Sequence, residues 1–348
     1  MRIIALFGPT GVGKTAIAIA LAERLRARGE DPVAVSADAL QVYAGLETLT
    51  GVASPAERAR LEHRLVSFLP LDATFSAGQY ARLAHAEIDD LLAAGRRAIV
   101  VGGTGLYLRA ALSELDLKPP PEEGVRERWR GQLEREGAPA LHAQLAARAP
   151  WAAARLDPND QQRIMRALEL HEAGELEAPE EEVVVEEEEP GGGSQAPEGG
   201  RRGGSESQLW SEEMRRPTLL VGLTMGREAL YALIDARVDA MVAAGAAEEV
   251  RRAQAAGVSE TARKALGFEE LLRGDVEGMK RRTRNYAKRQ LSWMRKLGGV
   301  RVLDVTGRSV DEVAGEISEL DAREARRESP ASGDAPGLAV TRESPGRR

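Results

Sequence analysis

A glycine-rich segment near the start of the chain has the composition and spacing of a phosphate-binding loop. Residues 8–15 read GPTGVGKT, the pattern GxxxxGK followed by Ser or Thr, between an apolar run and a helix-forming segment. Its glycines allow backbone N–H groups to face a phosphate, and the amino end of the helix adds partial positive charge. This placement disfavours a glycine-rich turn with a chance lysine. We predict a pyrophosphate site, with Lys14 on the outer phosphates and Thr15 as a Mg²⁺ ligand, formed by Gly8, Pro9, Thr10, Gly11, Val12, Gly13, Lys14 and Thr15.

Two further polar turns follow apolar runs. Asp38 comes after the run at 33–35, and the sequence Gly-Gly-Thr-Gly with Thr104 comes after the run at 99–101. In a parallel α/β sheet such turns meet at the carboxyl edge, where binding sites are built. Taken alone, Asp38 could be a helix N-cap, and a glycine-rich turn is often only a chain reversal.

The order of apolar runs and amphipathic segments predicts the elements that position these turns. Continuous apolar runs at 3–7, 33–35 and 99–101 are typical of strands buried on both faces, and strands are also predicted at 218–223 and 300–305. Helices are expected over 15–28 and 76–94, over the segment before residue 297, and in a final stretch that ends near residue 320. We therefore predict an α/β fold, a P-loop NTPase-like parallel sheet core with an all-α insertion domain.

The amino-acid composition changes along the chain and divides it into four parts. Residues 1–118 and 215–320 form the predicted P-loop core with its C-terminal helices, and residues 119–174, which begin at a triple proline, form the helical insertion domain. Residues 175–210 are rich in Glu and Gly and are predicted to be a disordered loop. Residues 321–348 are predicted to be a disordered tail.

The net charge of −7 conceals a basic region. Residues 172–208 hold 12 Glu and 2 Arg, which leaves a formal charge of +3 on the rest of the chain. Residues 280–301 hold nine Lys or Arg and no acidic residue, interleaved with Tyr286 and Trp293. Such a run is either a solvated helix face or a surface for nucleic-acid phosphates and bases.

Several classes of protein are excluded or disfavoured. The chain has no cysteine, which excludes disulfides, thiol catalysis and Cys-ligated metal centres, and its four histidines are scattered. The first apolar run lacks a basic flank and is too short for a signal peptide or membrane span, so we expect a soluble cytoplasmic protein with no membrane contact. The strand at 99–101 ends in glycine rather than in the acidic residue of an ordinary NTPase.

Five stretches together resemble the tRNA dimethylallyltransferases. They are the phosphate loop, the turns SADALQVY at 36–43 and GGTGLYL at 102–108, the segment DPNDQQR at 157–163, and TRNYAKRQ at 283–290 with Trp293 and Arg295. Their order and spacing agree with the family over residues 1–172 and 217–305. A C-terminal zinc finger requires cysteine, so the resemblance is to the bacterial form.

This resemblance implies a reaction and a set of contacts. Dimethylallyl diphosphate would occupy the phosphate loop with Mg²⁺, and its prenyl group would pass to N6 of adenosine 37, beside the tRNA anticodon, with release of pyrophosphate. Asp38 would be the general base and Thr104 would bond the adenine, which must be flipped out of the anticodon loop. The partner would be the anticodon stem-loop, bound to a monomer. The tRNA-binding residues implied are Asp38, Ala39, Leu40, Gln41, Thr104, Arg126, Gln162, Arg163, Arg166, Lys264, Gly267, Phe268, Lys288, Arg289, Gln290, Trp293 and Arg295.

Two alternative functions use the same loop. One is a small-molecule kinase that uses ATP, and the other is an RNA-binding protein that uses a nucleotide as a switch. The sequence also leaves open which tRNAs are modified, what the acidic loop and the tail do, and whether Arg227 and Arg237 approach the diphosphate or pair with Asp235 and Asp239.

Overall fold

The structure is a computed structural model that describes residues 1–115, 117–118, 120–178 and 213–328. Its centre is an all-parallel sheet in the order β3-β2-β4-β1-β5-β6. The parallel sheet expected from the apolar runs is confirmed, and β3 was not predicted. The strands are β1 (Ile3–Phe7), β2 (Pro32–Ala37), β3 (His63–Arg64), β4 (Arg97–Gly102), β5 (Thr218–Thr224) and β6 (Arg301–Asp304).

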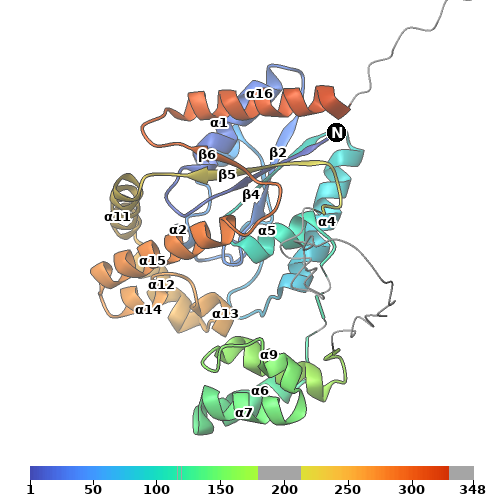
Figure 1. Cartoon of the computed structure of the whole chain (residues 1–348). Helices are drawn as coiled ribbons and strands as arrows, with labels where there is room; N and C mark the ends of the chain where they lie inside the picture. The colour runs from blue at the N-terminus through green and yellow to red at the C-terminus, as the bar shows by residue number, and fades with distance from the viewer. Residues whose placement is uncertain (116, 119, 179–212, 329–348) are drawn as a thin grey trace, which may run out of the picture.

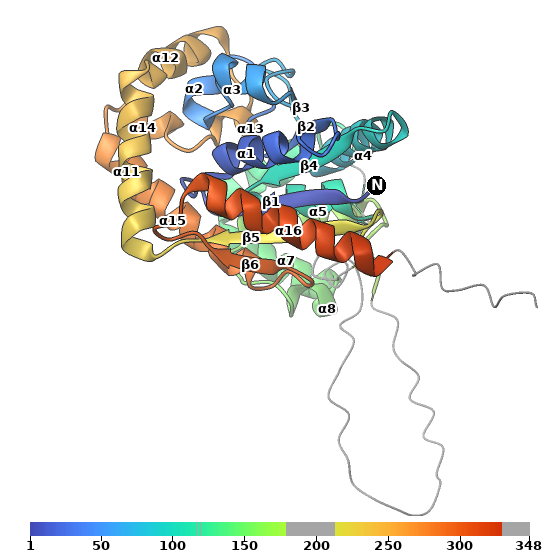
Figure 2. The ribbon, with the colours of Figure 1, turned by 90° about the horizontal axis from the view of Figure 1, so that it is seen from above.

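Successive residues of each central strand enter two different cores. In β1, Ile3, Ala5 and Phe7 face one core, whereas Ile4 and Leu6 face the other. Helices α1 (Lys14–Arg26) and α16 (Val310–Glu328) cover one face of the sheet, and α4 (Ala77–Ala93) and α5 (Gly105–Leu112) cover the opposite face (Figure 1). Seen from above, α16 lies across the strands (Figure 2). Both faces are therefore buried, which explains why the strands read as continuous apolar runs.

The remaining helices of the core gather at the carboxyl end of the strands (Figure 1). Two short helices follow β2, and five helices follow β5. They are α2 (Glu47–Thr50), α3 (Pro55–Arg60), α11 (Arg227–Ala243), α12 (Ala246–Ala256), α13 (Glu260–Arg263), α14 (Phe268–Leu272) and α15 (Val276–Met294).

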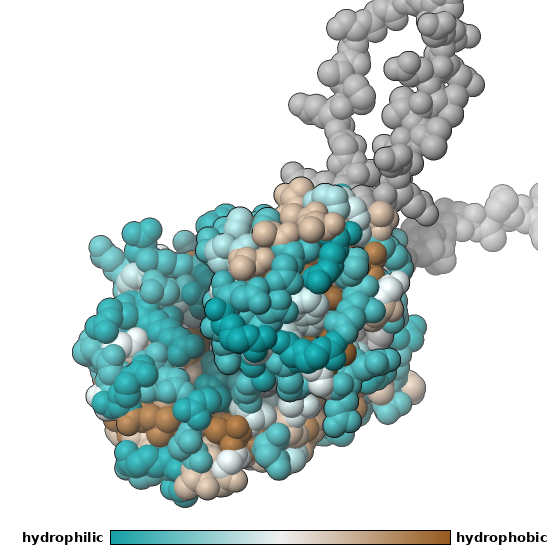
Figure 3. Space-filling model, turned by 90° about the horizontal axis from the view of Figure 1, so that it is seen from below, coloured by the Kyte–Doolittle hydropathy of each residue, from teal (hydrophilic) through white to brown (hydrophobic). Residues whose placement is uncertain are grey.

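The four helices described between α5 and residue 178 pack around an apolar core of their own. Trp129, Leu141, Leu145 and Ile164 are among its buried members. An ion pair of 2.8 Å between Arg130 of α6 and Glu260 of α13 joins this insertion to the sheet-bearing part. Seen from the side of the insertion, the surface is mostly hydrophilic and is recessed beside it (Figure 3). The helices are α6 (Val125–Glu136), α7 (Ala138–Arg148), α8 (Pro150–Ala153) and α9 (Gln161–Glu172).

The last helix is longer than the sequence indicated. The expectation of a disordered tail from residue 321 is wrong for residues 321–328, because α16 continues to Glu328. Asp321 and Glu324 explain the extension, since they pair with the buried guanidinium groups of Arg97 and Arg2. Residues 329–348 and 179–212, which include most of the predicted acidic loop, lie outside the described residues.

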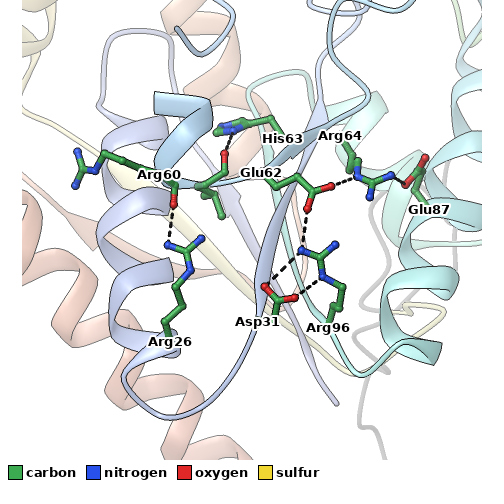
Figure 4. Close-up of polar contacts among 9 residues, drawn as sticks. Arg26, Asp31, Arg60, Glu62, His63, Arg64, Glu87 and Arg96 are labelled. Atoms are coloured by element: carbon green, nitrogen blue, oxygen red, sulfur yellow. Dashed lines mark hydrogen bonds and ion pairs between the residues drawn. The ribbon is translucent and has the colours of Figure 1, made fainter. Parts of the chain in front are cut away.

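The short strand β3 is held at the sheet edge by charged side chains rather than by an apolar run. Arg96 pairs with Asp31 at 2.6 Å and with Glu62 at 2.8 Å, and Arg64 also pairs with Glu62 (Figure 4). The bond from Arg96, with that from Arg64, lowers the pKa of Glu62 despite partial burial. A strand of two residues stabilised in this way gives no periodic signal in the sequence.

Candidate functional site

The phosphate loop lies between the end of β1 and the start of α1. Gly13 has φ 93°, a backbone angle that suits glycine, and no side chain caps the amino end of α1. Lys14 turns back onto the loop, where its Nζ donates to the carbonyl oxygens of Gly8 at 2.9 Å and Pro9 at 3.0 Å. The helix end therefore remains available to an anion.

A second cation, Arg237 of α11, belongs to this site. Its Nη2 approaches the Gly51 carbonyl oxygen at 3.5 Å. Burial, with the nearby charge of Arg237, lowers the pKa of Lys14 to about 8, while the charge of Asp38 acts in the opposite direction. Asp235 and Asp239 pair instead with Arg284 and Lys280, and neither forms an ion pair with Arg237 within the described residues. Arg227 is exposed at the start of α11.

Asp38 stands directly after β2, and one of its carboxylate oxygens holds the following turn. Oδ1 accepts from the backbone N–H of Leu40 at 2.9 Å and of Gln41 at 3.4 Å. The first helix after Asp38 begins only at Glu47, so Asp38 closes a turn and is not a helix N-cap. Within the described residues, Oδ2 has no hydrogen-bond partner. This arrangement fixes the carboxylate and leaves one oxygen available to a substrate.

Thr104 follows β4 and meets a tyrosine from α15. The hydroxyl groups of Thr104 and Tyr286 lie 3.1 Å apart. Burial raises the pKa of Tyr286 to about 12, and the charge of Asp38 acts in the same direction. Tyr286 is therefore a neutral hydroxyl at physiological pH, and the field of Asp38 reaches it across the site.

Gln290 occupies a position that the sequence did not indicate. The expectation that it faces tRNA is wrong, because its side chain is buried and both ends of its amide bond the protein itself. Its Oε1 accepts from the Thr10 N–H at 2.8 Å, and its Nε2 donates to the Gly103 carbonyl at 2.7 Å. A Cβ at Gly103 would lie 2.2 Å from Nε2, so this approach requires glycine.

Helix α15 has two unlike faces, which the helical period separates. Tyr286, Gln290 and Trp293 recur at helical spacing on the side toward the loops, and Trp293 packs on Gly105. Lys288 and Arg295, about half a turn away, are exposed, as is Arg289. These three cations form no ion pair within the described residues, whereas Lys280, Arg281, Arg282 and Arg284 do. The charge run is thus partly neutralised, and its unpaired cations lie toward its end.

The insertion provides a cluster around one buried carboxylate. Arg126 bonds both oxygens of Glu169, at 2.8 and 3.0 Å, and Arg166 bonds Glu169 at 3.1 Å. Burial opposes ionisation, but these bonds hold the pKa of Glu169 below its ordinary value. Gln162 and Arg163 are exposed on the same helix. Glu169 therefore ties Arg126 and Arg166 to the insertion, although the Arg126 side chain is itself exposed, as are those of Gln162 and Arg163.

Other candidate residues differ in access. Lys264 is exposed. The Phe268 side chain is fully buried against Arg263, and Gly267 is buried with φ 93°. The direct RNA contacts predicted for Phe268 and Gly267 are therefore wrong. Ala39 and Leu40 are half-buried. The Gln41 amide bonds Ser36 and the carbonyl oxygens of Thr50 and Gly51, so it supports the turn.

The residues present suit a cation held mainly by a substrate. No group of three or more His, Cys, Asp or Glu is arranged for a metal among the residues that the structure describes. Thr15, half-buried at the start of α1, offers one hydroxyl beside the loop. Mg²⁺ commonly takes few protein ligands and completes its shell with phosphate oxygens and water, so this donor set fits it.

The comparisons with known proteins point to one family. The family model described as IPP transferase matches residues 41–297. The tRNA dimethylallyltransferase of Thermobifida fusca is 37% identical over 305 residues, covering 84% of this chain and 87% of the relative. That of Rhodospirillum centenum is 40% identical over 310 residues, covering 84% and 88%. The similarity therefore extends well beyond the phosphate loop.

Solved structures agree in fold. The tRNA isopentenylpyrophosphate transferase of Bacillus halodurans is 28% identical with a TM-score of 0.63, covering 94% of this chain and 97% of that one. A eukaryotic dimethylallyltransferase solved acting on tRNA has a TM-score of 0.70 at 22% identity, covering 96% and 81%, and this likeness concerns the fold. Within the described ranges, no helix is long and apolar enough to cross a membrane.

Proposed function

The chain belongs to the tRNA dimethylallyltransferase family, and from this membership and the geometry of the site we propose how it works. It is a prenyl transferase, and its reaction is the transfer of a dimethylallyl group to tRNA. We propose that the donor is dimethylallyl diphosphate and the acceptor is N6 of adenosine 37 in the anticodon loop. The kinase alternative is not favoured, because the relatives over most of the chain are dimethylallyltransferases.

The proposed diphosphate site combines the loop amides with two cations. Lys14 and Arg237 lie together at the open amino end of α1, and they would stabilise the negative charge that develops on departing pyrophosphate. When bound, Mg²⁺ would be held by Thr15 and would neutralise part of that same charge. The C–O bond of the donor breaks with its electrons on pyrophosphate, while the allylic carbon forms its new bond to N6.

The single observation that carries the proposal is the state of the Asp38 carboxylate. One oxygen is fixed by two backbone N–H groups, and the other has no partner within the described residues. The N6 amine becomes acidic only as its bond to carbon forms, so an ionised carboxylate within hydrogen-bond reach suffices to accept its proton. We propose that Asp38 is this base and that Thr104 orients the adenine.

For RNA docking, we propose the exposed cations of α15 together with Lys264, Gln162 and Arg163. Lys288, Arg289 and Arg295 have no acidic partner within the described residues, so their charge is available to phosphates. The hydrophilic recess beside the insertion would receive the stem-loop (Figure 3). Arg126 and Arg166 would act by holding α6 and α9 together. We further propose that the enzyme works as a cytoplasmic monomer.

Incubation with labelled dimethylallyl diphosphate and unmodified tRNA tests this function. The tRNA should carry three adjacent adenosines in its anticodon loop, and a matched tRNA should have the central one replaced by guanosine. We expect label in the first tRNA and none in the second, with one pyrophosphate released per label. Labelling of both tRNAs, or γ-phosphate transfer from ATP without prenylation, would contradict the proposal.

A further inference from the structure

The buried amide of Gln290 joins two loops that serve different substrates in the proposed function. Thr10 belongs to the phosphate loop, and Gly103 belongs to the turn that presents Thr104. Both hydrogen bonds are short and lie inside the protein. Because a bound amide that loses its partners leaves buried polar groups unsatisfied, this link resists separation of the two loops.

Two other side chains on the same face of α15 also contact the turn that contains Thr104. The Tyr286 hydroxyl reaches Thr104 at 3.1 Å, and Trp293 packs so closely on Gly105 that a Cβ there would lie 2.0 Å from the indole ring. Tyr286, Gln290 and Trp293, each about one helical turn from the next, therefore connect the phosphate loop and the Thr104 turn. Of the exposed cations proposed to meet RNA, Lys288 and Arg295 lie on the opposite side of the helix, whereas Arg289 lies over the Tyr286 ring.

We propose that Gln290 and Tyr286 are positioning residues that set the separation and orientation of the donor site and the adenine site. The inference rests on the proposed function, since it assigns Thr10 and Thr104 to the two substrates. Gln290 acts through the Thr10 and Gly103 backbone, and Tyr286 acts through the Thr104 hydroxyl. Neither residue is needed to attract tRNA, because neither carries charge and Gln290 is buried.

Positioning of this kind has a large effect on rate. Reacting atoms must lie about 3 to 3.5 Å apart and aligned, and a displacement of about 1 Å can lower the rate about 100-fold. The Thr10 N–H is occupied by Gln290 rather than directed at a phosphate, so the amide shapes the loop without contacting the donor. Loss of either side chain should therefore lower kcat more than it changes substrate affinity.

The test uses Gln290→Leu, Tyr286→Phe and Thr104→Val in the full chain, with exposed Asn285→Ala as the control on the same helix. Label transfer gives kcat and KM, and filter binding gives the tRNA Kd. We expect kcat to fall about 10- to 100-fold in Gln290→Leu and about 5-fold in Tyr286→Phe. The tRNA Kd should stay within about 2-fold, and Asn285→Ala should match the wild type.

A double-mutant cycle separates positioning from a general loss of structure. If Tyr286 acts through Thr104, Tyr286→Phe should have little further effect on kcat once Thr104→Val has removed the hydroxyl. Additive losses, an unchanged kcat in both single variants, or losses confined to tRNA affinity would overturn the inference. If the Gln290→Leu variant does not fold, the double-mutant cycle of Tyr286→Phe and Thr104→Val tests the inference by itself. Failure of the proposed function is distinct, because it would be seen as no transfer by the wild type.

Discussion

Arg237 lies close enough to Lys14 for its charge to lower the pKa of the lysine, although the two side chains come from different parts of the chain. Both are half-buried near the open end of α1, where the loop carbonyl oxygens and the carboxylates of Asp38 and Glu57 moderate their repulsion. A diphosphate is the ligand that would relieve this repulsion. The pair therefore links the protonation of Lys14 to donor binding.

The first prediction is that donor binding takes up a proton near pH 8. Lys14 loses its proton as pH rises through about 8 in the free enzyme, and a bound diphosphate restores the protonated form by raising the pKa. Affinity should fall as pH rises above that value. Calorimetry in buffers of different ionisation heat measures the uptake, and Lys14→Arg, which stays charged, should show less uptake than the wild type. Equal uptake in both proteins would exclude Lys14 as the titrating group.

The second prediction distinguishes the two arginines of α11. Arg237→Gln should raise the KM for dimethylallyl diphosphate by about 10- to 100-fold, because a charge-assisted hydrogen bond in a buried site contributes about 1.5 to 3 kcal/mol. Arg227→Gln is the matched control, since Arg227 is exposed at the start of the same helix. Steady-state kinetics should show its KM within about 2-fold of the wild type. Equal effects of the two substitutions would contradict the assignment.

The third prediction concerns the end of α16. Ending the chain after residue 320 removes Asp321 and Glu324 and leaves the buried guanidinium groups of Arg97 and Arg2 without these partners. Arg97 keeps its longer ion pair with Glu30, at 3.6 Å, so the loss of the closer carboxylate should cost about 1 to 3 kcal/mol and lower the thermal midpoint by about 3 to 10 °C. Ending the chain after Glu328 keeps both partners and is the control. Identical unfolding midpoints for the two truncations would show that the extension is dispensable.

The sequence carried most of the fold but not the choice of helix faces. Apolar runs located β1, β2, β4 and β5, because strands buried on both sides need no periodicity, and the glycine patterns placed the loops at the carboxyl edge. The edge strand β6 was also predicted, although three of its four residues are exposed. Gln290 was assigned to RNA because a helix that is basic overall does not reveal which face packs inward. The spacing of Tyr286, Gln290 and Trp293 was the available signal. The place of Arg237 depends on how α11 crosses the loop, which no local pattern encodes.

The fourth prediction concerns Glu169 in the insertion. Its pKa is held below the ordinary value in the folded state, so its bonds stabilise the insertion above the unfolded-state pKa, about 4.3, and this contribution is lost as pH falls through the lowered folded-state value. The protection factors of the amides in α6 and α9, which are corrected for the slower intrinsic exchange in acid, should fall as pH falls. Glu169→Gln should have lower protection factors than the wild type at pH 7 and should show a smaller additional loss of protection in acid. If the variant keeps the full acid response, another group must be responsible.

The fifth and most direct measurement is prenyl transfer by the Asp38→Asn variant under single-turnover conditions with saturating dimethylallyl diphosphate and tRNA. Asparagine is similar in size and keeps an oxygen for the turn, but it cannot accept the N6 proton as a carboxylate does. The account predicts a rate about 100- to 10,000-fold below the wild type, with the tRNA Kd within about 2-fold. A wild-type rate in Asp38→Asn, or a loss explained entirely by weaker tRNA binding, would contradict the assignment of Asp38 as the base.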